Sequence, residues 1–169
     1  MRNASALAAA LLSFVWGGAS NAAGNWHVET IEDASASGSA IALMQESAKT
    51  IKGESGTSDV RPVIELRCVP GNAAITARID WQRFISSFST EVGFKVDGGR
   101  FMWLKWKVDQ SERVTISPSA EDSQKLIDAL SAGSELLVEV SPYSQAPETA
   151  SFDLSGFSDS LASLMSKCQ

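Results

Sequence analysis

Residues 151–168 read SFDLSGFSDSLASLMSKC, a stretch that ends a strand, turns at Ser-Gly and continues as an amphipathic helix. From Phe157 onward the apolar residues recur at intervals of three and four, so they lie on one face of an α-helix. That face consists of Phe157, Leu161, Leu164, Met165 and Cys168. The other cysteine, Cys68, lies on the same side of an alternating strand as Ile64 and Leu66. We therefore expect the last helix to pack on a sheet, with both cysteines on buried faces.

The first 23 residues have the pattern of a cleavable signal peptide. Arg2 supplies a positive start, residues 4–16 form an apolar run, and small residues fill the rest of the segment. The run is shorter than the roughly 20 apolar residues that a membrane-spanning helix needs. We predict a signal peptide over residues 1–23 and a periplasmic location for residues 24–169.

An exported chain with two cysteines on apolar faces favours a disulfide, because the periplasm is oxidising. We predict a bridge between Cys68 and Cys168; two buried free thiols are the alternative. The bridge would close a loop of about 100 residues. In the chain-entropy model such a loop contributes about 4–5 kcal/mol to stability.

The composition is acidic. The 169 residues have a net charge of -6, and residues 1–23 contain one arginine and no acid, so the remainder has a net charge of about -7. This balance argues against nucleic acid as a partner, because neutralising phosphates requires clustered Lys and Arg. About 145 residues remain after cleavage, which suffices for one core. We predict a single β-rich domain over residues 24–169, with no nucleic acid partner and no stable membrane insertion.

Alternating apolar residues predict a chain dominated by strands. The predicted strands cover residues 26–31, 40–44, 63–69, 75–81, 92–96, 101–108, 136–140 and 149–154. Asp97-Gly98 is a strong hairpin signal, because both central residues of a type I′ turn need φ > 0. Residues 48–61 are rich in Gly, Ser and charge without an apolar period, which predicts a mobile loop.

A helix is predicted before the last two strands. Ser119 is a suitable N-cap, and Glu121 and Asp122 lie in the first turn, where the helix dipole favours acids. Its buried stripe consists of Leu126, Ile127 and Leu130. The chain is therefore expected to be α+β and mostly β: an antiparallel sheet or sandwich of about seven strands with two packed helices and one disulfide.

The order of these features resembles a known family. The features are Trp26, Leu66-Arg67-Cys68, Asn72, Trp81, the hairpin from Phe94 to Gly98, Ser141-Pro142-Tyr143, the segment 151–157 and Cys168. Together they resemble the VasI (TagO-like) family of periplasmic proteins associated with type VI secretion. The chain departs from the family pattern at Lys95, where members often have Arg, and at its last residue, which is not aromatic. The Leu-Ser-Gly-Phe segment is also similar to the end of invasion-associated locus B proteins, whose cysteine pattern fits less well. The resemblance implies a role in the cell envelope and transfers no catalytic residue.

The residues offer little support for catalysis. His27 is the only histidine, and the chain has no Gly-x-Ser-x-Gly nucleophile motif. One histidine and two cysteines expected to be oxidised leave too few ligands for a tetrahedral metal site. Pairs of carboxylates that meet in space stay open as a possibility. We predict a protein that is not an enzyme, without metal or cofactor.

The best candidate for a binding surface is the outer face of the 92–108 hairpin, which we call the hairpin face. It consists of Lys95, Phe101, Trp103, Lys105 and Lys107. Aromatic rings beside cations suit a sugar, a peptidoglycan stem peptide or an acidic protein surface. The alternative is that Phe101 and Trp103 pack under a helix, with the lysines at the rim. It is the favoured arrangement on general grounds, because strands that are apolar on both faces are usually covered. Tyr143 lies on a proline-bounded loop and is a further candidate contact.

Two outward arginines on neighbouring strands are expected to be paired rather than part of this face. Arg67 and Arg78 lie within reach of Glu65 and Asp80.

Two functions follow as hypotheses. The first is a non-enzymatic periplasmic accessory or binding protein, associated with type VI secretion, whose partner is an envelope or secretion-apparatus protein or a peptidoglycan-related ligand. The alternative is an inhibitor or binder of a lysozyme-type enzyme that degrades the cell wall, because an acidic exported protein suits a cationic target. A hydrolase that uses paired carboxylates ranks last.

Overall fold

The structure is a computed structural model that describes residues 25–33 and 38–169. The predicted signal peptide, residues 1–23, lies outside the described residues and stays a prediction. Within the described ranges no helix is long and apolar enough to cross a membrane.

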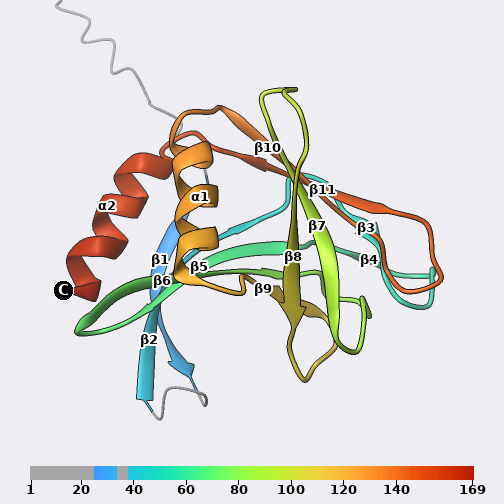
Figure 1. Ribbon diagram of the computed structural model, residues 1–169, viewed down its shortest axis with the longest axis horizontal. Helices are drawn as coiled ribbons and strands as arrows, with labels where there is room; N and C mark the ends of the chain where they lie inside the picture. The colour runs from blue at the N-terminus through green and yellow to red at the C-terminus, as the bar shows by residue number, and fades with distance from the viewer. Residues whose placement is uncertain (1–24, 34–37) are drawn as a thin grey trace, which may run out of the picture.

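In the described part of the chain, nine strands form one antiparallel sheet in the order β1-β2-β5-β6-β9-β8-β7-β10-β11 (Figure 1). They are β1 (His27–Asp33), β2 (Gly38–Glu46), β5 (Val63–Val69), β6 (Asn72–Asp80), β7 (Ser89–Val96), β8 (Met102–Val108), β9 (Val114–Ile116), β10 (Glu135–Val140) and β11 (Glu148–Asp153). A separate small hairpin consists of β3 (Ile51–Lys52) and β4 (Asp59–Val60).

The sheet curls into a half-barrel, so that its first and last strands approach each other. The indole Nε1 of Trp26 and the amide Nε2 of Gln45 both donate to the backbone oxygen of Asp153, each at 2.9 Å. The backbone N–H of Ala48 donates to the oxygen of Ser151 on β11 at 2.8 Å. These bonds join the β1–β2 end of the sheet to β11.

Both helices cover the inner face of the curled sheet. Helix α1 (Ala120–Ser131) contacts β6 and β7, and α2 (Phe157–Cys168) contacts β1, β2 and β6. The two helices lie next to each other (Figure 1). The core between helices and sheet includes the fully buried Leu66, Ile79, Trp106, Phe152 and Leu164.

The prediction of a seven-strand sheet or sandwich is therefore wrong in its details. A single sheet of nine strands buries one face under two helices, whereas a sandwich would bury it under a second sheet. Both arrangements produce the same alternation of apolar and polar residues along each strand. The alternation therefore identified the strands without identifying what covers them.

The predicted disulfide is confirmed. Cys68 on β5 and Cys168 on α2 are bonded, with their Cα atoms 5.9 Å apart, and both residues are buried. The backbone N–H of Gly71, in the turn after β5, donates to the oxygen of Cys168 at 2.9 Å. The end of α2 is thus joined to β5 by a covalent bond and to the β5–β6 turn by a hydrogen bond.

Local predictions agree with the structure at several positions. The Ser119 hydroxyl accepts from the backbone N–H of Asp122 at 3.1 Å and caps α1. Asp97 and Gly98 have φ of 49° and 71°, as the hairpin signal requires. The expected mobile loop 48–61 is wrong in part, because it contains the β3–β4 hairpin, with Ile51 buried. Strands β3 and β4 have two residues each, which is too few to show an apolar period in the sequence.

Candidate binding surface

The hairpin face lies on the outer face of the sheet, which the helices leave uncovered. On β8, Trp103 is 45% exposed, whereas Trp106, on the inner face, is fully buried. Lys105 and Lys107 are exposed. The alternative for this strand, packing under a helix, is therefore wrong for Trp103. The β7–β8 turn projects from the rest of the sheet at the top of Figure 1.

Trp103 is positioned by a glycine on the neighbouring strand. Gly93 on β7 is its register partner, and a Cβ added to Gly93 would lie 2.9 Å from two atoms of the six-membered ring of Trp103. Because that distance is below van der Waals contact, the ring occupies the volume a larger residue would fill. An aromatic ring that covers a strand glycine is a known way of fixing sheet register. The indole is thus held in place although it is exposed.

Phe101 and Lys95 extend the same surface toward the turn. The ring centroids of Phe101 and Trp103 lie 5.4 Å apart, with an interplanar angle of 31°. The ammonium nitrogen of Lys95 lies 4.9 Å from the centroid of the Phe101 ring, which is within cation–π range. Two rings and one cation of the hairpin face therefore form a continuous cluster.

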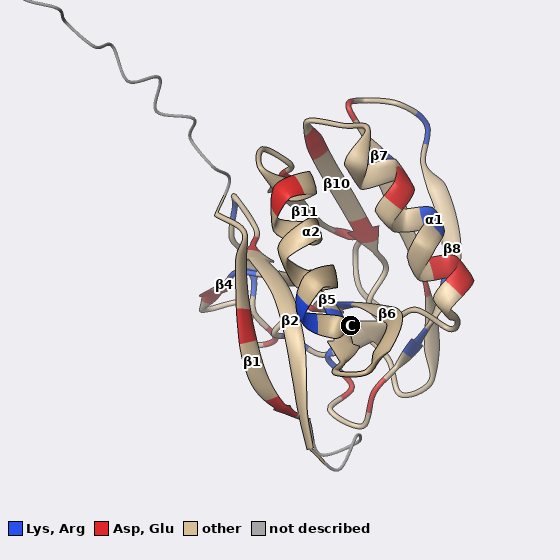
Figure 2. Cartoon of the chain, turned by 90° about the vertical axis from the view of Figure 1, so that its left-hand side faces the viewer, with Lys and Arg blue, Asp and Glu red and all other residues tan. Residues whose placement is uncertain are grey.

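Within the part of the chain that the structure describes, the lysines of the hairpin face make no ion pair. Glu91 on β7 stands opposite Lys105 in the register, but none of the ion pairs among the described residues involves Lys95, Lys105 or Lys107. These cations remain available to an outside ligand. Elsewhere the surface carries acidic residues on β1, α1 and both ends of β10 (Figure 2).

A shallow, open pocket of about 370 Å³ lies beside Trp103. It is lined by Thr90 and Glu91 of β7, Trp103 of β8, and Ser141, which directly follows β10. The lining combines one indole, one carboxylate and two hydroxyl-bearing residues. Such a set can stack on a flat ring and also donate and accept hydrogen bonds around its edge.

Tyr143 is exposed, as expected, but it lies outside this pocket lining. Tyr143 is 73% exposed, and its backbone N–H donates to the backbone oxygen of Ile85 at 2.8 Å. The nearby loop before β7 carries Phe88, which is 84% exposed and which no sequence pattern indicates as a contact. A single phenylalanine before a strand gives no sequence signal for such exposure.

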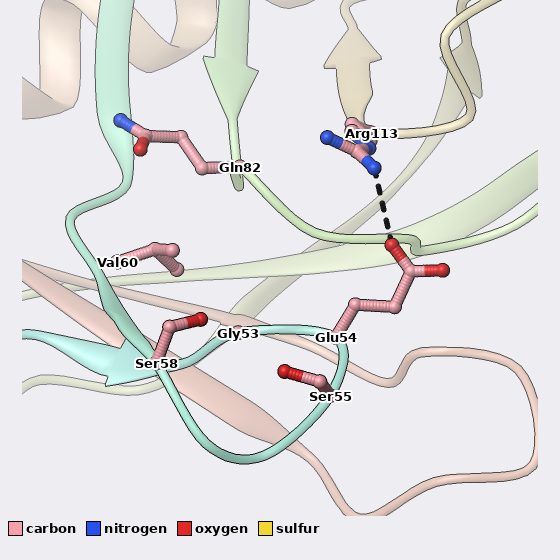
Figure 3. A pocket seen from close by; sticks show the side chains of 7 residues that line it. All are labelled: Gly53, Glu54, Ser55, Ser58, Val60, Gln82 and Arg113. Atoms are coloured by element: carbon pink, nitrogen blue, oxygen red, sulfur yellow. Dashed lines mark hydrogen bonds and ion pairs between the residues drawn. The ribbon is translucent and has the colours of Figure 1, made fainter.

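A second pocket, of about 470 Å³, lies between the β3–β4 hairpin and the loops that follow β6 and precede β9. Glu54 and Arg113 point toward each other at its rim, with Oε2 and Nη2 3.2 Å apart (Figure 3). The amide Nε2 of Gln82 donates to the oxygen of Arg61 at 2.6 Å. The charged groups of this pocket are already paired and no aromatic ring lines it. It is therefore a weaker candidate than the pocket at Trp103.

Arg83 holds three segments of the chain together. The sequence did not predict this role. Arg83 is 4% exposed; its Nη1 donates to the oxygen of Lys52 at 2.7 Å and also pairs with the carboxylate of Glu148, while Nη2 donates to Gln145. A buried guanidinium with several acceptors is a structural anchor. Its partners lie 31 to 65 positions away, so only the folded chain reveals them.

The carboxylate of Asp97 fixes the turn end of the hairpin face. It accepts bonds from the hydroxyl of Ser134 at 2.7 Å and from the backbone N–H groups of Ser134 and Glu135, each at 2.9 Å. These bonds, the Ser134 hydroxyl foremost, hold the pKa of Asp97 below its ordinary value. The β7–β8 turn is thereby tied to the start of β10.

The outward arginines of β5 and β6 are paired, as expected, although one partner differs. Glu65 pairs with both arginines: its Oε1 lies 2.6 Å from Nε of Arg67, and its Oε2 lies 3.4 Å from Nε of Arg78. The second partner of Arg78 is Asp109, at 3.6 Å, rather than Asp80. Asp80 instead accepts from a backbone N–H in the following turn. These arginines do not extend the hairpin face.

The candidate metal ligands among the described residues do not form a metal site. His27 is exposed on β1. Within residues 25–33 and 38–169 no three side chains among His, Cys, Asp and Glu gather in a way that would hold a metal ion. The expectations of a non-enzyme without cofactor stay predictions.

Fold and surface together define a disulfide-bonded, helix-covered half-barrel with an aromatic and cationic outer face. Comparison with known protein families, with curated proteins and with solved structures found no match.

Proposed function

We propose that this chain is a non-enzymatic accessory protein of the bacterial periplasm that captures an envelope component on the hairpin face. The observation that carries the proposal is Trp103, an indole 45% exposed yet held over Gly93. Exposed aromatic residues in a fixed position are typical of binding hot spots. The lysines beside it, which make no ion pair with any described residue, add attraction for an acidic group.

The periplasmic location rests on the signal-peptide pattern of residues 1–23 and agrees with the disulfide. The assignment to type VI secretion rests on the resemblance to the VasI family. We therefore propose the secretion apparatus, or the wall around it, as the setting of the interaction.

Site-directed photo-crosslinking in living cells tests this proposal. A photoreactive amino acid at position 103 is expected to form a specific adduct with an envelope component. The matched control has the same amino acid at Ala162, which is exposed on α2, and is expected to give none. Equal labelling from both positions, or none at position 103, would count against the hairpin face.

A double variant tests the same face by a different route. Trp103→Ala with Lys105→Glu is expected to abolish capture. The melting temperature is expected to fall by only about 4–6 °C, because the contact of the indole with Gly93 contributes about 1–2 kcal/mol and Lys105 is exposed. The control variant Lys125→Glu changes the same charge on α1. If the double variant loses a large part of its stability, Trp103 has a structural role instead.

A second function is favoured by the acidic residues on β1, α1 and β10 (Figure 2). These surfaces suit a cationic lysozyme-type enzyme, which the protein would inhibit by binding. This reading predicts stoichiometric suppression of a muramidase that weakens with added salt. It also predicts that the Trp103 variants inhibit as well as the unaltered protein.

A further inference from the structure

We infer that the pocket beside Trp103 is a subsite for one sugar ring of an acidic glycan, with the lysines of the hairpin face binding its carboxylates. This inference rests on the proposed function, because it names the ligand class for the same face. It goes further in assigning Glu91 and Ser141 as ligand-binding residues.

The size of the pocket favours a small ligand. Its volume of about 370 Å³ lies near the lower end of the range of small-molecule pockets, roughly 300–1,000 Å³. A protein partner of ordinary affinity needs roughly 800 Å² on each side and an apolar centre. In the pocket lining the aromatic surface is contributed by Trp103, beside Thr90, Glu91 and Ser141, which suits a narrow ligand better than a broad interface.

The chemistry of the lining favours a sugar over an apolar ligand. An indole offers a flat apolar surface to the C–H face of a pyranose, while Glu91 and Ser141 offer acceptors and a donor to its hydroxyls. Thr90 completes the lining. A purely apolar ligand would leave the Glu91 carboxylate without a hydrogen bond at the cost of desolvation.

The cations indicate that the glycan is acidic. Lys105 lies in the register position next to Glu91, and Lys95 lies over Phe101. Neither lysine is in an ion pair within the described part of the chain. A sugar in the pocket would therefore place a carboxylate on an adjoining unit within reach of an unpaired ammonium group. Peptidoglycan strands, whose stem peptides carry free carboxylates, have this chemistry.

Tryptophan fluorescence of the protein measures such binding directly. Of the four tryptophans in the described residues, Trp26, Trp81 and Trp106 are buried and Trp103 is 45% exposed. A ligand on the pocket is expected to shift the emission of the exposed tryptophan to shorter wavelength. The two probes are a soluble disaccharide-tetrapeptide from peptidoglycan and chitotetraose, which has neutral sugars only.

The expected result is saturable binding of both probes, with the peptidoglycan fragment about tenfold tighter at low salt. Glu91→Gln is expected to weaken both about fivefold. Lys105→Gln is expected to remove the preference for the fragment and leave chitotetraose unchanged. Phe88→Ala, which alters an exposed aromatic residue outside the pocket lining, and Lys125→Gln serve as controls. Calorimetry with Trp103→Ala, which removes the fluorophore, is expected to show at least about tenfold weaker binding.

Two results would overturn the inference. The first is no emission shift and no heat with either probe at millimolar concentration. The second is binding that is indifferent to Glu91→Gln and Lys105→Gln. If glycans fail to bind while an envelope protein is crosslinked at position 103, the ligand class is wrong and the proposed function stands. If Trp103 is needed neither for glycan binding nor for crosslinking of an envelope protein, the inference and the proposed function are both wrong.

Discussion

Removing the disulfide measures how strongly the last helix depends on its covalent bond to the sheet. The variant Cys68→Ala/Cys168→Ala deletes the bridge, whose cysteines are 100 positions apart, and keeps both sites apolar. In the chain-entropy model, losing a cross-link of that length lowers the free energy of unfolding by about 4.7 kcal/mol at 25 °C. Loss of two buried sulfur atoms adds about 1 kcal/mol for imperfect repacking. The total of about 5–6 kcal/mol is large against the roughly 5–15 kcal/mol that stabilises a typical domain.

Urea unfolding, followed by circular dichroism and tryptophan fluorescence, measures this difference. With a slope of about 2 kcal/mol per molar urea, the midpoint is expected to fall by about 2.5–3 M. The slope is expected to rise, because the unfolded chain without a cross-link exposes more surface. The unaltered protein, unfolded with reductant present, is the matched control and should follow the variant. A loss below about 1.5 kcal/mol would refute the reasoning and mean that packing alone holds α2.

Three further predictions concern the anchors of the fold. Arg83→Leu removes the donors that serve Glu148 and two other acceptors, so the free energy of unfolding should fall by about 2–4 kcal/mol; unchanged urea unfolding would argue against the anchor. Gly93→Ala should lower the free energy of unfolding by about 1–2 kcal/mol, mainly by displacing the ring of Trp103. Most of this cost should be lost in a Trp103→Ala background, where the added methyl still meets Cδ1 of Phe101 at 3.0 Å, whereas equal costs in both backgrounds would exclude the contact with Trp103. Hydrogen bonds lower the pKa of Asp97 in the folded protein below its ordinary value of 3.8, so its stabilisation is present above about pH 4 and is lost as the pH falls further. Asp97→Asn should therefore be less stable than the unaltered protein at pH 7, with a difference that narrows toward pH 3; a difference independent of pH would contradict this sign.

The sequence predicted best those features that a local period expresses. The alternation around Cys68 and the helical spacing that ends at Cys168 placed both sulfurs on buried faces, and the disulfide followed. The same alternation on β8 separated the exposed Trp103 from the buried Trp106. In each case one side of a strand or helix is apolar. Such a side is visible in the sequence as apolar residues that recur every two, three or four positions.

Other features depend on contacts between distant segments and give no local signal. Strand β9 has three residues, too few for a period. The anchoring role of Arg83 depends on partners contributed by two other segments. The pocket beside Trp103 requires the register that places Gly93 and Glu91 opposite β8, together with the loop that brings Ser141 alongside. Register and sheet curvature are properties of the assembled sheet.

The carbonyl of Asp153, which accepts bonds from side chains 127 and 108 positions earlier, has a consequence for how the molecule is made. Synthesis delivers the chain from its N-terminus, so the early strands lack their closing contacts until the segment around Asp153 has been made. Contacts of such long sequence separation slow folding and leave a period in which a nascent chain is open to proteases and to premature thiol oxidation. Stop codons introduced just before the final helix should therefore yield degraded material instead of a smaller stable domain.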